Sequence, residues 1–235
     1  MASSPDAVDP DYRRPPRWML LRESAALTSR VWRAFGHLRE RGPADGRRLL
    51  VIPGFLATDR TTLGLIRALA EAGWRVSGWG LGMNTGVQKD TLERIVARIE
   101  RFGRGRPIVL VGWSLGGIYA REAAKRRPDL VSHVVTLGSP FSGDLRTNNN
   151  VRALYELVAG HPVDRPPIET VVSEKPPVPT LALWSRRDGI VAPGAARGRD
   201  TERDAETELD CSHMGFAVSA SAYPKVVEAV RAFTA

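Results

Sequence analysis

The stretch from Val109 to Gly117 places a serine between a strand and a helix, and it constrains the fold more than any other part of the chain. An apolar run ends in the pattern G-x-S-x-G around Ser114, and a helix-forming segment over 118–127 follows at once. A serine on so tight a turn adopts a strained backbone that projects its hydroxyl clear of the sheet, and Gly112 and Gly116 remove side chains that would collide there. The pattern predicts a nucleophile elbow, with the positive end of the helix beside Ser114.

A base for this serine is expected later in the chain, on a loop that follows a strand. His213 meets this description, because it follows a strand-like segment over 206–211 and precedes a final helix predicted over 217–233. The remaining histidines are interpreted as loop, solvated or packing residues: His37, His133 and His161. We therefore predict that His213 takes the proton of Ser114 during attack.

The acid that orients the histidine is expected on a loop between the nucleophile and the base in the chain. Asp188 follows the strand predicted over 180–184 and is the first choice. It would hold the imidazole in the tautomer that presents a free nitrogen to Ser114, and it would stabilise the imidazolium that forms. Asp144, which trails the preceding strand, is a rival that the sequence leaves open.

The oxyanion formed during attack needs preorganised N–H donors. One donor is the backbone N–H of Leu115, the residue after the nucleophile. The second is assigned to Phe55, in the loop after the strand predicted over 49–52, because the turn at Gly54 lets this N–H face the site. Leu56 is the alternative if the loop is wound one residue differently.

These motifs resemble those of bacterial α/β-hydrolases of the lipase and carboxylesterase type. The resemblance extends from Leu49 to Phe233. It is carried, in order, by the Pro53-Gly54-Phe55 oxyanion loop, the Gly112-Trp113-Ser114-Leu115-Gly116 elbow, the Asp188-Gly189-Ile190-Val191 acid loop and the Ser212-His213-Met214-Gly215 histidine loop. It implies ester hydrolysis through a serine acyl-enzyme, with no metal and no organic cofactor. The family often has His-Gly where this chain has Pro53-Gly54, so a histidine that could brace the oxyanion loop is absent.

Predicted strands and helices alternate along the chain, which is typical of a mainly parallel sheet with helices on both faces, the α/β-hydrolase arrangement. The strands are predicted over 49–52, 75–79, 108–111, 134–137, 180–184 and 206–211, and the helices over 61–72, 91–102, 118–127 and 217–233. At 235 residues and 43% hydrophobic, the chain suits one domain with a full core, predicted over 46–235. An insertion over 139–178 is predicted to form a small lid with a short helix over 151–159, which Asn150 caps unless it binds substrate.

Residues 1–45 are predicted to form an N-terminal extension with an amphipathic helix. The apolar run over 18–21 is too short for a signal peptide, and the charges that follow exclude a membrane span. Leu27, Val31, Trp32, Phe35 and Leu38 could form one apolar face. We favour packing of this face on the domain near the mouth of the site over an interfacial position on a lipid surface.

The net charge of +8 raises the question of a nucleic-acid or membrane partner. The arginines are spread in singles and pairs and no nucleic-acid motif is visible, so we predict no nucleic-acid partner; weak, salt-sensitive peripheral association with anionic lipid stays an alternative. The single cysteine, Cys211, excludes an internal disulfide and is interpreted as a packing residue. Nothing demands an oxidising compartment, so we expect a cytoplasmic protein, and the oligomeric state is left undetermined.

Apolar residues beside the catalytic loops predict an apolar acyl pocket and an ester or lipid substrate. The predicted substrate-binding residues are Leu56, Trp113, Phe141 and Met214. Acyl transfer and thioester cleavage would use the same triad. A non-catalytic ligand-binding protein of this fold would be expected to lose Ser114 or His213, and this chain retains both.

Overall fold

A parallel sheet lies at the centre of the computed structural model, which describes residues 9–20, 23, 40–144, 150 and 170–235. Within these ranges six strands pair in the order β2-β1-β3-β4-β5-β6, and every pair is parallel. The strands are β1 (Arg48–Ile52), β2 (Arg75–Gly78), β3 (Ile108–Trp113), β4 (Val131–Leu137), β5 (Thr180–Trp184) and β6 (Ala205–Glu208). Since all strands run the same way, the loops that follow them meet at one edge of the sheet.

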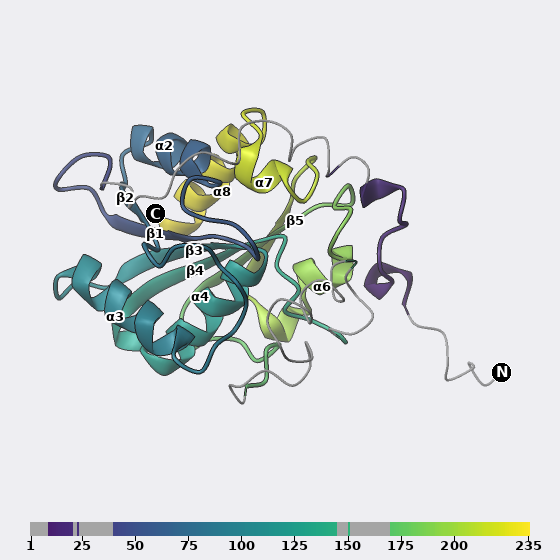
Figure 1. Cartoon of the computed structure of the whole chain (residues 1–235), viewed down its shortest axis with the longest axis horizontal. Helices are drawn as coiled ribbons and strands as arrows, with labels where there is room; N and C mark the ends of the chain where they lie inside the picture. The colour runs from purple at the N-terminus through teal and green to yellow at the C-terminus, as the bar shows by residue number, and fades with distance from the viewer. Residues whose placement is uncertain (1–8, 21–22, 24–39, 145–149, 151–169) are drawn as a thin grey trace.

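Helices cover both faces of the sheet (Figure 1). One layer holds α2 (Leu63–Glu71), α7 (Gly215–Val218) and α8 (Tyr223–Thr234), and the other holds α3 (Thr91–Gly103) and α4 (Leu115–Arg126). Alternate residues of β1 show why two layers are needed: Leu49 and Val51 pack into the α2–α8 core, whereas Leu50 and Ile52 pack into the α3–α4 core. A short helix, α6 (Pro193–Arg197), follows β5, and the 3₁₀ turns are η1 (Pro10–Tyr12), η2 (Pro128–Leu130) and η3 (Asp200–Glu202).

Two predicted elements near the C-terminus were wrong in extent. The strand predicted over 206–211 ends at Glu208, so the loop that carries His213 begins earlier than expected. The helix predicted over 217–233 is two helices, because the backbone of Ser219 is extended and α8 begins anew at Tyr223, with Pro224 in its first turn. Proline has no N–H for a helical bond and its ring disfavours a preceding helical turn, so α7 cannot run on into α8. The helix predicted over 151–159 lies outside the described residues.

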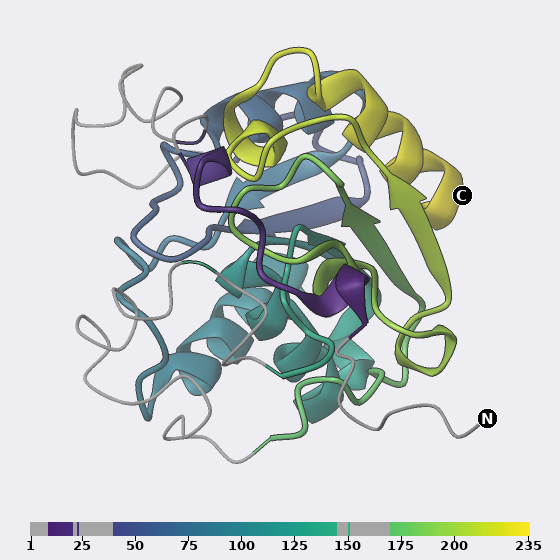
Figure 2. The ribbon, with the colours of Figure 1, turned by 90° about the vertical axis from the view of Figure 1, so that its right-hand side faces the viewer.

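The described start of the N-terminal extension packs on the domain. Figure 2 shows it in purple, crossing in front of the sheet. Tyr12 of η1 lies so close to Gly143 that a Cβ there would come within 2.6 Å of its ring, and Asp11 pairs with Arg197 of α6 at 3.1 Å. The apolar face predicted between Leu27 and Leu38 lies outside the described residues. None of the helices in the described ranges has the length and apolar character needed to span a bilayer.

Candidate active site

Ser114 occupies the turn between β3 and α4 with a φ of 55° and a ψ of −124°. This is a strained conformation for a residue with a side chain, as the sequence predicted for a nucleophile elbow. A Cβ at Gly112 would lie 2.3 Å from the carbonyl oxygen of Gly116, and a Cβ at Gly116 would lie 2.2 Å from that of Ile52. Both positions therefore require glycine, the first because of the turn itself and the second because α4 starts against β1.

The two segments predicted to donate to the oxyanion both lie beside Ser114. Leu115 is the first residue of α4, and the first N–H groups of a helix have no acceptor within it. A Cβ at Gly54 would lie 3.0 Å from the Cβ of Ser114, so the loop after β1 touches the nucleophile. The N–H of Leu56 donates to the carbonyl oxygen of Asn84 at 2.7 Å and is thereby engaged away from substrate. The assignment of the second donor to Phe55 stays a prediction.

Asn84 braces this oxyanion loop, a role that sequence reasoning missed. Its buried side chain donates from Nδ2 to the carbonyl oxygen of Pro53 at 2.9 Å, and its backbone N–H donates to the carbonyl oxygen of Ala57 at 2.9 Å. With the bond from Leu56, three hydrogen bonds hold the loop after β1 against the loop after β2. Asn84 thus supplies bracing contacts in a chain that lacks a histidine at position 53.

Asp188 and His213 form a buried pair at the ends of the adjacent strands β5 and β6. Oδ2 of Asp188 lies 2.8 Å from Nδ1 of His213, and the residues are 1% and 2% exposed. Oδ1 of Asp188 accepts the N–H groups of Ile190 and Val191, each at 2.8 Å. Because one carboxylate oxygen is held by its own loop, the other is aimed at the imidazole. A carboxylate at Nδ1 favours the tautomer in which Nδ1 carries the proton and Nε2 is free.

The surroundings of His213 favour its protonated form. Burial by itself lowers the pKa of His213, but the charge of Asp188, the hydrogen bond to it and the charge of Glu23 together raise that pKa above its ordinary value. Nε1 of Trp113 donates to the carbonyl oxygen of His213 at 3.1 Å, which fixes the loop from the side of β3. Burial, followed by the charges of Asp188 and Glu23, raises the pKa of the nearby Cys211 to about 12, so this thiol stays neutral.

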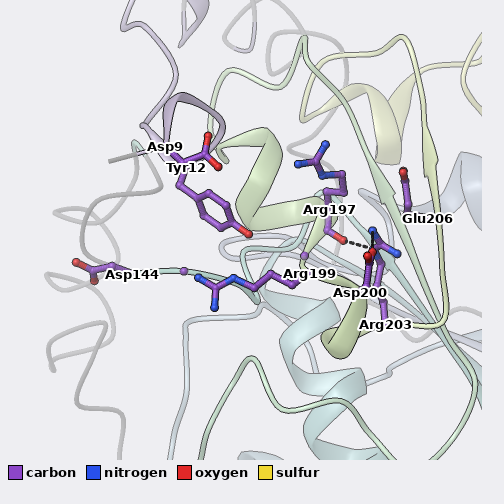
Figure 3. A pocket seen from close by; sticks show the side chains of 10 residues that line it. Asp9, Tyr12, Asp144, Arg197, Arg199, Asp200, Arg203 and Glu206 are labelled. Atoms are coloured by element: carbon purple, nitrogen blue, oxygen red, sulfur yellow. Dashed lines mark hydrogen bonds and ion pairs between the residues drawn. The ribbon is translucent and has the colours of Figure 1, made fainter. Parts of the chain in front are cut away.

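Asp144, the rival acid, lies elsewhere. It lines a pocket of about 790 Å³ between η1 and the end of α6, together with Tyr12, Arg197 and Arg199 (Figure 3). The Arg199 guanidinium lies 5.9 Å from the centre of the Tyr12 ring across this pocket. The carboxylate hydrogen-bonded to the imidazole of His213 is that of Asp188.

The predicted substrate-binding residues differ in exposure. Leu56 is 38% exposed, whereas Trp113 and Met214 are buried beside His213. Phe141 is 1% exposed and lies beneath the guanidinium of Arg121, which is 4.1 Å from its ring centre, so it presents no open wall to an acyl chain in this structure.

Asn150 and His133, which the sequence also singled out, both make contacts within the fold. Asn150 donates from Nδ2 to the carbonyl oxygens of Pro15 at 2.8 Å and Gly189 at 2.9 Å, so its side chain ties loops together. His133 packs edge-on against Phe233, in agreement with a packing role, and burial, followed by the charge of Arg47, lowers its pKa. His37, His161 and the predicted lid helix lie outside the described residues.

Comparison with known proteins agrees with this geometry. Residues 47–160 match the family model described as alpha/beta hydrolase fold. The chain has the α/β-hydrolase fold. Its six parallel strands with helices on both faces are that fold.

The individual proteins that this chain is similar to are distant from it. A structure from the metagenome-derived lipolytic enzymes LipS and LipT is 16% identical, with a TM-score of 0.61 over 83% of this chain and 96% of the other. The monoacylglycerol lipase of Paleococcus ferrophilus is 16% identical, with a TM-score of 0.60 over 85% of this chain and 100% of the other. In the bifunctional biotin biosynthesis protein BioHC of Teredinibacter turnerae, 60 residues are 33% identical, covering 26% of this chain and 10% of that protein. At these identities the likeness to the solved structures shows the fold alone.

Proposed function

We propose that this α/β-hydrolase cleaves carboxylic esters of small molecules or lipids through Ser114, His213 and Asp188. One observation carries the proposal: the chain holds a serine in a strained elbow at the N-terminus of α4, and it buries a carboxylate–imidazole pair on the loops after β5 and β6. These are the parts needed to activate a hydroxyl that is a poor nucleophile at neutral pH. Esterase and lipase neighbours of the same fold support this reaction class.

The first half of the reaction forms an acyl-enzyme. Oγ of Ser114 attacks the ester carbonyl carbon while Nε2 of His213 takes the hydroxyl proton, and Asp188 stabilises the resulting imidazolium. The carbonyl oxygen becomes an oxyanion that accepts the N–H groups of Leu115 and Phe55. The imidazolium then gives its proton to the alkoxide as the C–O bond breaks, and the alcohol leaves.

The second half regenerates the serine. Water attacks the acyl carbon while His213 takes one of its protons, and the same N–H groups hold the second oxyanion. Collapse of this intermediate returns the proton from His213 to Ser114 and releases the carboxylic acid. Another alcohol or a thiol in place of water would give acyl transfer through identical steps, so the acceptor defines the activity.

An apolar acyl pocket is part of the proposal. Leu56 and Met83 are exposed on the two loops that Asn84 joins, and the first of these loops touches Ser114 at Gly54. Burial of each added methylene contributes about 0.8 kcal/mol, so kcat/KM should rise severalfold per CH₂ until the pocket is full. Short-to-medium acyl esters are therefore the proposed substrates.

The test combines p-nitrophenyl esters from C2 to C16 with an active-site fluorophosphonate probe, on the wild type and on Ser114→Ala. We expect labelling of the wild type alone and a rise in kcat/KM beyond acetate. An optimum at acetate, or no dependence on chain length, would contradict the apolar pocket while leaving the catalytic assignment intact. Absence of both labelling and turnover would favour a non-catalytic ligand-binding protein. Parallel assays with acyl thioesters and with added alcohols separate thioesterase and acyltransferase activity from ester hydrolysis.

A further inference from the structure

Glu23 of the N-terminal extension is buried between the two loops that carry Asp188 and His213. It is 3% exposed. Its Oε1 accepts the N–H groups of Gly189 at 3.1 Å and His213 at 2.9 Å, and its Oε2 accepts the N–H of Met214 at 2.9 Å. One side chain, distant in sequence, thus contacts the residue after the acid, the base itself and the residue after the base.

The chemistry of this site requires a carboxylate. All three partners are donors, and an ionised carboxylate is an acceptor at both oxygens, whereas an amide would turn an NH₂ group toward at least one N–H. Burial of a charge is costly, and hydrogen bonds from several N–H groups to a charged acceptor offset that cost. We therefore expect that the amide of a Glu23→Gln variant cannot make the same three bonds.

The backbone around Glu23 is fitted to this contact. A Cβ at Gly189 would lie 2.8 Å from the carbonyl oxygen of Met19 and 3.1 Å from Oε1 of Glu23. The side chain of Asn150 joins the carbonyl oxygens of Pro15 and Gly189 nearby. The close approach of the N-terminal segment to the acid loop therefore depends on glycine at position 189. A substitution at Gly189 can disturb this contact without changing Glu23 itself.

We propose that Glu23 is a positioning residue, which fixes the acid loop against the histidine loop and adds a second negative charge beside His213. The bridge through Glu23 spans the same gap as the bond between Asp188 and His213, so loss of the bridge frees the loops to shift relative to each other. A misplacement of about 1 Å can cost on the order of 100-fold in rate. The catalytic consequence rests on the proposed function, whereas the effect on the imidazole does not.

The effect of the Glu23 charge can be tested through the pKa of the His213 imidazole. Among the described residues, the charged groups that raise its pKa are Asp188 and Glu23. From β3 the side chain of Trp113 faces it, and from the end of β4 Gly138 lies near Nδ1; neither is charged. The Cys211 thiol, whose pKa is raised to about 12, is neutral. We therefore expect that removal of the Glu23 charge lowers the pKa of His213, since one of the two charges that raise it is gone.

The experiment compares full-length wild type with Glu23→Gln, and uses Glu202→Gln as the matched control. Glu202 is also buried and accepts a backbone N–H, that of Arg199 at 2.9 Å, but belongs to η3. The titration of the His213 imidazole is followed by NMR without substrate, and kcat and KM are measured against pH on the best ester. Glu23→Gln is expected to lower the His213 pKa and to reduce kcat by about 10- to 100-fold with little change in KM. Glu202→Gln is expected to titrate and turn over as the wild type does.

Two further variants keep the proposal falsifiable if Glu23→Gln folds poorly. Gly189→Ala should displace the N-terminal segment through Met19 and shift the His213 titration in the same direction, whereas Glu23→Asp, which keeps the charge, should leave the titration closer to that of the wild type. An unchanged His213 titration in folded Glu23→Gln and Gly189→Ala overturns the proposal. The proposal is also overturned if the activity of Glu23→Gln falls only in proportion to the fraction of active sites that the fluorophosphonate probe titrates, because the remaining sites would then work at the wild-type rate. A wild type without ester turnover would count against the proposed function, while the NMR titration would still decide the role of Glu23.

Discussion

Asp188 and His213 meet across two neighbouring parallel strands, with 2.8 Å between Oδ2 and Nδ1 in a site closed to solvent. The pairing of β5 with β6 sets this distance, because it places the ends of the two strands side by side. Each carboxylate oxygen of Asp188 has separate partners, its own loop for one and the imidazole for the other. The imidazole orientation therefore depends on backbone contacts as well as on the pair itself.

The strained backbone of Ser114 predicts opposite effects of substitution on activity and stability. Ser114→Ala and Ser114→Gly should both lose ester hydrolysis and fluorophosphonate labelling, since each lacks the hydroxyl. Ser114→Gly should be more stable to urea than Ser114→Ala, by about 1 kcal/mol, because glycine adopts a φ of 55° with little strain. A less stable glycine variant would show that the elbow stores no strain. Residual turnover must be judged against the uncatalysed rate.

The two candidate acids are separated by a pair of matched substitutions. Asp188→Asn should lower kcat by about 10⁴, because an amide at Nδ1 favours the wrong imidazole tautomer. Asp144→Asn should have a mild effect, since Asp144 lines the pocket beside Tyr12 and Arg199. Steady-state kinetics on one ester measure both. A larger loss in Asp144→Asn would transfer the role of the acid to that residue.

The raised pKa of His213 predicts where activity falls at low pH. His213 must be neutral to accept the proton of Ser114, so kcat/KM declines as pH drops through its pKa in the free enzyme. Since Asp188 and Glu23 raise that pKa, the acid limb should lie above 6.5, the ordinary value for histidine. A profile of kcat/KM between about pH 4 and 9 measures this limb. A midpoint at or below 6.5 would mean that desolvation outweighs the two carboxylates.

The same shift has a consequence for stability. A folded-state pKa above the unfolded value means that the folded protein binds the proton more tightly. This contribution is fully present below the unfolded pKa of histidine and is lost as pH rises through the folded pKa. The free energy of unfolding of His213→Gln should therefore fall below that of the wild type by more at pH 6 than at pH 9, values on either side of the ordinary pKa. Urea titrations at the two pH values check this, and an equal deficit at both would contradict it.

Loss of the Asn84 side chain should weaken the oxyanion loop. Asn84→Ala leaves the carbonyl oxygen of Pro53 and the N–H of Gly86 without their side-chain partner, at an expected cost of about 1–3 kcal/mol in the free energy of unfolding. It should also lower kcat more than it raises KM, because the oxyanion donors act mainly in the transition state. Gln88→Ala, an exposed amide in the same loop, is the control and should change neither quantity. Equal free energies of unfolding and equal kcat values for Asn84→Ala and Gln88→Ala would show that Asn84 has no role at the site.

The sequence by itself determined the features that local patterns encode. The elbow lies within nine consecutive residues, and its glycines, apolar strand and following helix are readable without knowledge of the fold. Apolar runs and helical spacing located the central strands and helices, because burial on one or both faces imposes those periods. The order of the motifs along the chain was sufficient for the α/β-hydrolase fold, which the structure and the family match confirm.

Tertiary structure alone decided which distant groups meet. Asp188 rather than Asp144 contacts His213 because β5 pairs with β6, and no local pattern specifies that pairing. Glu23 reaches the backbone of His213 across 190 residues, and Asn84 reaches Pro53 across 31, through single side chains that leave no periodic signal. Such residues are recognised only when the fold brings a buried acceptor or donor against groups that would otherwise be unsatisfied, because burial makes each unpaired polar group costly.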